Sequence, residues 1–197
     1  MSKELAQQAL AIKALQEYYK PQRESLIEFT KYMLENALKR QFDDNWHYND
    51  IADQLEAIER GEINRLIICQ PPRSGKTMLA TIMYALWRLG RDSKCQICVA
   101  GYSTTLTQNF SKEARDLYIS EAYRRIFPEA SKIRDDQNTK DHWALVSGGR
   151  YYATGAEGTI TGMGFDLIIL DDLLKANDAG SETVRKGVNN WYLNEME

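Results

Sequence analysis

Apolar residues recur at helical spacing in the first part of the chain. Over residues 2–19, side chains such as Leu5 and Ile12 stand among Lys and Gln residues, which predicts an amphipathic helix that ends at Pro21. A second amphipathic helix is expected over about 22–39. We interpret the apolar faces of both helices as surfaces for packing or for contact with another subunit.

Two continuous apolar runs follow, at Leu66-Ile67-Ile68-Cys69 and at Leu167-Ile168-Ile169-Leu170. The first is bounded by polar residues and by Pro71, which predicts a short buried strand. The second is typical of a central parallel strand covered on both faces. Other strands are expected at about 96–100, 143–146 and 150–153, and other helices at about 50–60, 75–89, 104–118 and 120–126. A glycine-rich loop, expected to be mobile, joins Gly155 to Gly164.

This alternation of strands and helices predicts an α/β fold with a mostly parallel central sheet flanked by helices. We expect residues 1–40 to form an N-terminal helical segment and residues 41–197 to form the α/β domain. Only 25 residues follow Asp172 in a chain of 197. We therefore expect the α/β domain to be incomplete at its C-terminus.

The composition narrows the class of protein. With 43% hydrophobic and 27% charged residues, the chain resembles a globular protein rather than a disordered one. No apolar run reaches the roughly 18 residues that span a bilayer, so we expect no membrane contact. The net charge of −3 argues against a basic, domain-wide DNA surface, so any DNA contact has to be local. The three cysteines do not suggest a disulfide framework, and Cys95 and Cys98 would point to opposite faces of a strand.

The strongest chemical signal lies between the first apolar run and the helix expected at 75–89. It is typical of a phosphate-binding (Walker A) loop, in which backbone N–H groups and a helix N-terminus hold the phosphates of a nucleotide. Lys76 would neutralise the β and γ oxygens, and the Thr77 hydroxyl would bind Mg²⁺. The predicted nucleotide-binding residues of this segment are Gln70, Pro71, Pro72, Arg73, Ser74, Gly75, Lys76, Thr77 and Met78.

Two features of this loop depart from the simplest pattern. Gln70 stands where the motif G-x-x-x-x-G-K-[ST] has its first glycine. Arg73 lies within the loop, where its guanidinium could reach a γ-phosphate as an arginine finger supplied by the same chain.

The second apolar run ends in Asp171 and Asp172. Asp171 would hold the Mg²⁺ ion, and Asp172 would polarise the water that attacks the γ-phosphorus. Asp172, Arg73 and Lys76 are therefore the predicted catalytic residues, and Thr77 and Asp171 the predicted metal ligands.

Three weaker signals have alternative interpretations. Trp46 could stack on the adenine base or anchor its loop to the core. The segment Gly101–Thr105 could touch nucleotide or DNA, or cap the helix that follows. The segment Asn138–Asp141 resembles a guanine-reading motif with a displaced lysine, and we interpret it as a turn.

Several segments together resemble the large terminase subunit of tailed bacteriophages, the ATP-driven motor that packages DNA into a capsid. The resemblance spans about residues 25–197. The phosphate loop and the acidic pair Asp171-Asp172 are two of the segments that carry the resemblance. The others are residues 61–68, 122–128, 148–151, 158–162 and 166–175, followed by Ser181, Arg185, Trp191 and Tyr192.

The resemblance implies a P-loop ATPase of the additional-strand class, with ATP and Mg²⁺ as cofactors. It further implies double-stranded DNA, the portal protein and the small terminase subunit as partners, a homo-oligomeric ring on the procapsid, and the host cytoplasm as location. The family's endonuclease domain is expected to lie outside these 197 residues.

Two residues depart from the family pattern. The family commonly has Glu where this chain has Asp172, and often has an arginine where this chain has Met163. An arginine that reaches a neighbouring subunit is therefore unassigned, with Arg150, Arg124 and Arg125 as candidates. A helicase-like or other DNA-dependent P-loop ATPase, and a nucleotide-binding fragment without turnover, remain alternatives.

Overall fold

The computed structural model describes residues 3–156, 158–160, 162–175 and 177–195, with side chains from residue 7 onward. Ser2 of the first predicted helix and Thr161 of the glycine-rich loop lie outside the described residues. The chain divides into two compact units, one formed by Met1–Cys69 with Leu117–Glu129 and the other by Gln70–Asp116 with Ala130–Glu197. The predicted domain boundary at residue 40 stays a prediction.

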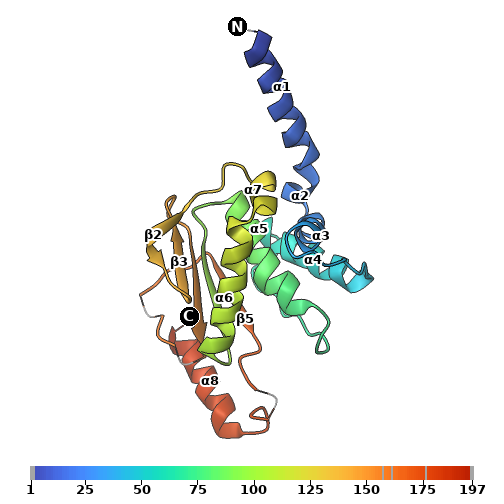
Figure 1. Cartoon of the computed structure of the whole chain (residues 1–197). Coiled ribbons are helices and arrows are strands. Elements are labelled where there is room, and N and C mark those ends of the chain that lie inside the picture. The colour runs from blue at the N-terminus through green and yellow to red at the C-terminus, as the bar shows by residue number, and fades with distance from the viewer. Residues whose placement is uncertain (1–2, 157, 161, 176, 196–197) are drawn as a thin grey trace. The chain divides into compact units, whose positions relative to one another are not determined.

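The first unit is helical (Figure 1). Its helices are α1 (Lys3–Tyr18), α2 (Lys20–Glu24), α3 (Leu26–Asn36), α4 (Trp46–Glu59) and α7 (Glu121–Ile126). Pro21 lies in the first turn of α2, where its missing N–H costs no helical hydrogen bond. The first predicted helix is confirmed, whereas the second is divided because the backbone of Ser25 is extended.

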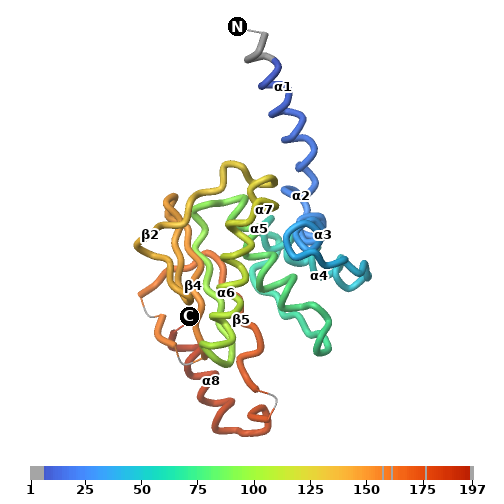
Figure 2. Tube along the Cα trace, viewed as in Figure 1, coloured from blue at the N-terminus to red at the C-terminus, as the bar shows by residue number. Residues whose placement is uncertain are grey.

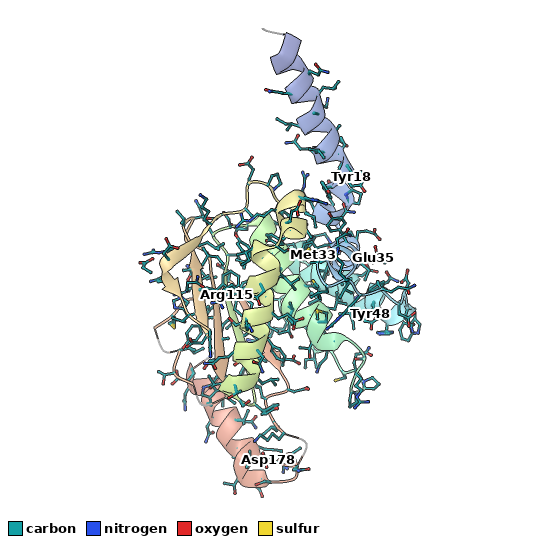
Figure 3. The ribbon with its side chains drawn as sticks, viewed as in Figure 1. Tyr18, Met33, Glu35, Tyr48, Arg115 and Asp178 are labelled. Carbon is teal, nitrogen blue, oxygen red and sulfur yellow. The ribbon has the colours of Figure 1, made fainter. Side chains whose placement is uncertain are left out.

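An aromatic cluster forms the centre of this unit. The ring of Phe29 on α3 lies 6.1 Å from that of Tyr123 on α7 and 6.0 Å from that of Phe127. Met33, on the same helix, is fully buried, whereas Tyr18 at the end of α1 is exposed (Figure 3). The periodic apolar positions of α3 therefore do form a core-facing stripe.

The second unit contains a five-stranded mixed sheet in the order β2-β3-β4-β1-β5. The strands are β1 (Gln96–Gly101), β2 (Ile133–Asn138), β3 (His142–Leu145), β4 (Arg150–Gly155) and β5 (Leu167–Asp171). The central strand β1 is parallel to β4 and β5, whereas the β2–β3 and β3–β4 pairs are antiparallel. The α/β prediction is confirmed, but the sheet is mixed rather than mostly parallel because the short β3–β4 turn forms a hairpin.

Helices flank this sheet. The segment after the phosphate loop forms a π-helix, η1 (Thr77–Met83), that continues into α5 (Tyr84–Arg91), and α6 spans Thr104–Ile119. The indole N–H of Trp143 on β3 donates to Ser111 Oγ on α6 at 3.2 Å, and Figure 1 shows α6 across one face of the sheet. Arg115 on α6 donates to Asn138 Oδ1 at 2.9 Å at the end of β2 (Figure 3).

The last helix, α8 (Glu182–Glu195), follows β5 through a loop, as the trace in Figure 2 shows. It contacts the glycine-rich loop, because Trp191 Nε1 donates to the carbonyl of Gly158 at 2.8 Å and Glu195 accepts from the N–H of Ile160 at 3.0 Å. No helix in the described part of the chain is both long and apolar enough to cross a membrane.

The prediction of a buried strand at 66–69 is wrong. The described residues include no strand there, and the side chain of Ile67 is 87% exposed. A short apolar run forms a strand only when a neighbouring strand supplies the hydrogen-bonding ladder, and the run itself does not determine that neighbour.

The second apolar run does form a strand, β5, but at the edge of the sheet. Ile168 and Leu170 are each 38% exposed, so the prediction that both faces are covered is also wrong. Both residues project from the same face, since alternate residues of a strand share a side. The other face carries Asp171, which is buried.

Candidate functional site

The predicted phosphate loop surrounds a pocket of about 400 Å³. The pocket lies wholly in the second unit, and Asp172 at the end of β5 completes its lining. The loop residues that line it are Gln70, Pro71, Pro72, Arg73, Ser74, Gly75, Lys76, Thr77 and Met78. The structure thus brings every predicted loop residue and the predicted base to one cavity.

The backbone of the loop turns through two left-handed residues. Gly75 has a φ of +79°, which glycine adopts without steric cost, and Arg73 has a φ of +64°, which is unfavourable for a residue with a Cβ atom. After this turn the carbonyl of Gly75 accepts from the N–H of Leu79 at 3.1 Å. Thr77 begins η1 and lines the pocket together with Met78, so the pocket lies at the N-terminus of this helix.

Lys76 joins the loop to the end of β5. Its Nζ lies 2.9 Å from Asp172 Oδ1 and 3.4 Å from Asp171 Oδ1. Burial lowers the pKa of Lys76, but the hydrogen bond to Asp172 and the charges of both carboxylates outweigh it, so the pKa is raised. The lysine is therefore a fixed cation at the pocket at every physiological pH.

Asp171 is the buried member of the acidic pair, with only 4% of its surface exposed. Its Oδ2 accepts a hydrogen bond from the hydroxyl of Thr81 on η1 at 3.2 Å, and its Oδ1 faces Lys76. Thr81 is not among the site residues predicted from the sequence. The sequence feature that could have identified it is a threonine one helical turn after Thr77, within an otherwise apolar segment.

Asp172 has a φ of +46°, so its backbone is left-handed, and its side chain is 69% exposed. Its carbonyl accepts from the N–H of Tyr102, just after β1, at 3.1 Å. Lys175 Nζ lies 5.6 Å from the centre of the Tyr102 ring. Ser103 Oγ accepts from the N–H of Leu106 at 3.3 Å, so the Gly101–Thr105 segment caps α6 and also contacts the acidic pair.

The donor set fits a magnesium ion carried by a phosphate ligand. The Thr77 hydroxyl and the two carboxylates offer hard oxygen atoms, which Mg²⁺ prefers. Within the described residues no cluster of three or more His, Cys, Asp or Glu side chains could hold a metal alone. Mg²⁺ commonly binds through one or two protein oxygens together with nucleotide phosphates and water.

The remaining predicted residues lie elsewhere. Trp46 begins α4 in the first unit and is 76% exposed, and its contact with adenine stays a prediction. Arg150 donates to the carbonyl of Gly164 at 2.9 Å and lies over the ring of Phe165. Arg124 lies over the Tyr118 ring, and Arg125 pairs with Glu121. A role of any of these arginines at a neighbouring subunit is untested.

Two lesser motifs have structural explanations. In the Asn138–Asp141 segment the Thr139 hydroxyl accepts from the N–H of His142 at 3.1 Å, which confirms a turn. Burial raises the pKa of the Cys98 thiol to about 12, and burial also raises that of Cys95. Both thiols therefore stay protonated at neutral pH.

A protein-family model matches most of this chain. The model of the N-terminal part of the terminase large subunit, T4-like virus type, matches residues 67–194. No curated protein matches the chain. The matched segment begins just before the phosphate loop and ends within α8, so it contains the whole pocket and the acidic pair. The chain therefore belongs to the terminase large subunit family, which supports a role in phage DNA packaging.

Proposed function

We propose that this chain is a P-loop ATPase domain of the additional-strand class that hydrolyses ATP to move double-stranded DNA into a procapsid. The observation that carries the proposal is the placement of Lys76 between two strand-end carboxylates at the phosphate-loop pocket. Phosphoryl transfer from a nucleotide requires a cation, a hydroxyl and carboxylates close together, and here Lys76 and Thr77 line the pocket while the buried Asp171 lies beside the lysine.

Each group has a distinct task in this proposal. Lys76 and Arg73 stabilise the negative charge on the phosphoryl group as it is transferred. Thr77 and Asp171 hold Mg²⁺, which when bound neutralises charge on the phosphate oxygens. Asp172 accepts a hydrogen bond from the attacking water and orients it. Because Asp is shorter than Glu, Asp172 has to lie closer to that water or act through a second one.

The contacts of Lys76 support these separate roles. Lys76 Nζ is nearer to Asp172 than to Asp171, so the exposed carboxylate is the main partner of the lysine. A bound phosphate would compete for Lys76 and release Asp172 toward the solvent-accessible side of the pocket. Asp171, which is buried and hydrogen-bonded to Thr81, would remain in place.

The partners in this proposal follow from the family. Members act on phage DNA, so the substrates are ATP and double-stranded DNA, in the cytoplasm of the host cell. We propose the portal protein and the small terminase subunit as partners, with several copies arranged as a ring. Trp46 is proposed to contact adenine.

ATP turnover tests the proposal. The chain is assayed with Mg²⁺ in three conditions, without DNA, with double-stranded DNA and with single-stranded DNA, beside Lys76→Ala, Asp171→Ala and the control Lys186→Ala, which alters an exposed lysine paired with Glu182 on α8. We expect turnover in the unaltered and control proteins and a loss of about 10³-fold in the other two. Equal turnover in all four would refute the site. Nucleotide binding without turnover would favour the non-hydrolysing alternative, and stimulation restricted to single-stranded DNA would favour the helicase-like one.

A further inference from the structure

A buried hydroxyl–carboxylate contact lies directly beneath the pocket. Thr81 and Asp171 are 2% and 4% exposed, and the Thr81 hydroxyl donates to Asp171 Oδ2 at 3.2 Å. The two residues are 90 positions apart, so the contact joins η1 to the end of β5.

The contact divides the two oxygens of Asp171 between two environments. Oδ2 faces inward to Thr81, whereas Oδ1 faces Lys76 at 3.4 Å. A carboxylate held at one oxygen cannot rotate freely about its last torsion, so the direction of the other oxygen is fixed. Oδ1, on the side of Lys76, is therefore the oxygen that would face a metal-bound water.

The helix that carries Thr81 also carries Thr77. Residues four apart in a helical turn lie on the same side, which places Thr77 at the pocket and Thr81 one turn further along. Segments of π-helix such as η1 are rare and often accompany functional sites. This geometry lets one helix offer one hydroxyl to the metal position and another to the carboxylate.

We propose that Thr81 is a positioning residue that holds the carboxylate of Asp171 so that Oδ1 faces the metal side of the pocket. The inference rests on the proposed function, because it assumes that Mg²⁺ binds with a nucleotide at this pocket. Residues that orient a metal ligand from behind affect metal affinity by about 10- to 100-fold. Thr81 acts through Asp171 and touches neither the nucleotide nor the metal.

The test measures the Mg²⁺ concentration that gives half-maximal thermal stabilisation of the chain by ADP, and separately the binding of ADP in EDTA. Thr81→Val removes the hydroxyl at nearly constant volume, and Thr81→Ser restores it. The matched control is Thr30→Val, because Thr30 is also 2% exposed and its hydroxyl donates to the carbonyl of Leu26 at 2.8 Å in the other unit. If Thr81→Val fails to fold, Thr81→Ala, which also removes the hydroxyl, takes its place.

We expect Thr81→Val to raise the half-maximal Mg²⁺ concentration by about tenfold or more. Thr81→Ser and Thr30→Val should stay close to the unaltered protein, and ADP binding in EDTA should be unchanged in all. Unchanged Mg²⁺ dependence in Thr81→Val would overturn the inference, as would an equal loss of binding in EDTA, which indicates a purely structural role. If the unaltered protein binds Mg-ADP but does not hydrolyse ATP, the proposed function fails and the Thr81 assignment is still judged by these data. If it binds no ADP at all, both are overturned.

Discussion

Lys76 Nζ and Asp172 Oδ1 lie 2.9 Å apart, although the two residues are 96 positions apart in the chain. The ion pair joins the phosphate loop to the end of β5. The loop cation is thus already compensated by a carboxylate that itself lines the pocket. An anionic ligand has to compete with Asp172 for the lysine.

This competition predicts opposite effects of Asp172→Asn on binding and on turnover. Removing the negative charge should strengthen Mg²⁺-free ADP binding a few-fold, because the phosphates then meet less repulsion and a less occupied lysine. ATP turnover should fall by about 10²- to 10⁴-fold, the usual contribution of a general base. Calorimetry in EDTA and a steady-state assay measure the two effects. Weaker ADP binding with normal turnover would contradict the assignment of Asp172.

Because the backbone of Arg73 is left-handed, two substitutions at this position can distinguish an effect on stability from an effect on catalysis. Arg73→Gly and Arg73→Ala both remove the guanidinium, but only Gly relieves the positive φ. We expect Arg73→Gly to be more stable to urea than Arg73→Ala by about 1 kcal/mol. Both should lose about 10³-fold in turnover if Arg73 acts as an arginine finger. A large difference in turnover between the two would show that loop conformation, rather than the guanidinium, limits the rate.

The lowered pKa of His142 leads us to expect that the protein is less stable in mild acid. Burial lowers the pKa of this histidine, the charge of Arg150 lowers it further, and Asp141 partly opposes both. The unfolded chain then binds the proton more tightly than the folded chain, so the free energy of unfolding falls as pH drops below the ordinary histidine value of 6.5. Urea unfolding at several pH values should show a smaller decrease for His142→Leu. An identical pH dependence in the two proteins would count against this assignment.

We expect substitution by alanine to have opposite effects on stability at two glycines, Gly149 and Gly187. A Cβ atom at Gly149, in the turn before β4, would lie 2.5 Å from the carbonyl oxygen of Ser93 and 3.0 Å from that of Cys95. Both are backbone atoms that cannot move aside, so Gly149→Ala should destabilise the protein by about 1 to 3 kcal/mol. Gly187, inside α8, has open space around the Cβ position, and Gly187→Ala should stabilise it by about 0.5 to 1 kcal/mol. Thermal unfolding of both variants tests the pair, and a stable Gly149→Ala protein would contradict the packing of this turn.

The pattern of apolar and polar residues along the sequence predicts those helices and strands whose buried positions follow a simple rule. β1 and α6 are found close to their predicted bounds, because a fully buried strand leaves a short continuous apolar run and an amphipathic helix leaves a clear period in the sequence. β2 was missed because its residues, from Arg134 onward, are polar and exposed, so its pairing with β3 leaves no apolar signal. Conversely, Leu66–Cys69 has the signal of a strand without forming one. The hydrophobicity of a segment indicates that it tends to be buried, but it does not indicate which other segment it packs against or pairs with.

The candidate site also contains residues that the sequence predicts and residues that it does not predict. The phosphate loop and the acidic pair have residue types and spacings that follow from the chemistry of phosphate and magnesium, so the sequence predicts their meeting. The roles of Thr81 and Tyr102 depend on which helix turn and which strand end lie beside Asp171 and Asp172. Such contacts between distant segments have no counterpart in local sequence pattern.

The binding of a non-hydrolysable ATP analogue with Mg²⁺, measured by calorimetry, tests the central claim most directly. It compares the unaltered chain with Lys76→Ala and with the exposed-lysine control Lys186→Ala. The account predicts one binding site in the unaltered and control proteins and at least about tenfold weaker binding in Lys76→Ala, since a charge-assisted hydrogen bond contributes about 1.5 to 3 kcal/mol. Equal affinity in all three proteins, or no binding in any, would contradict the assignment of this pocket to a nucleotide.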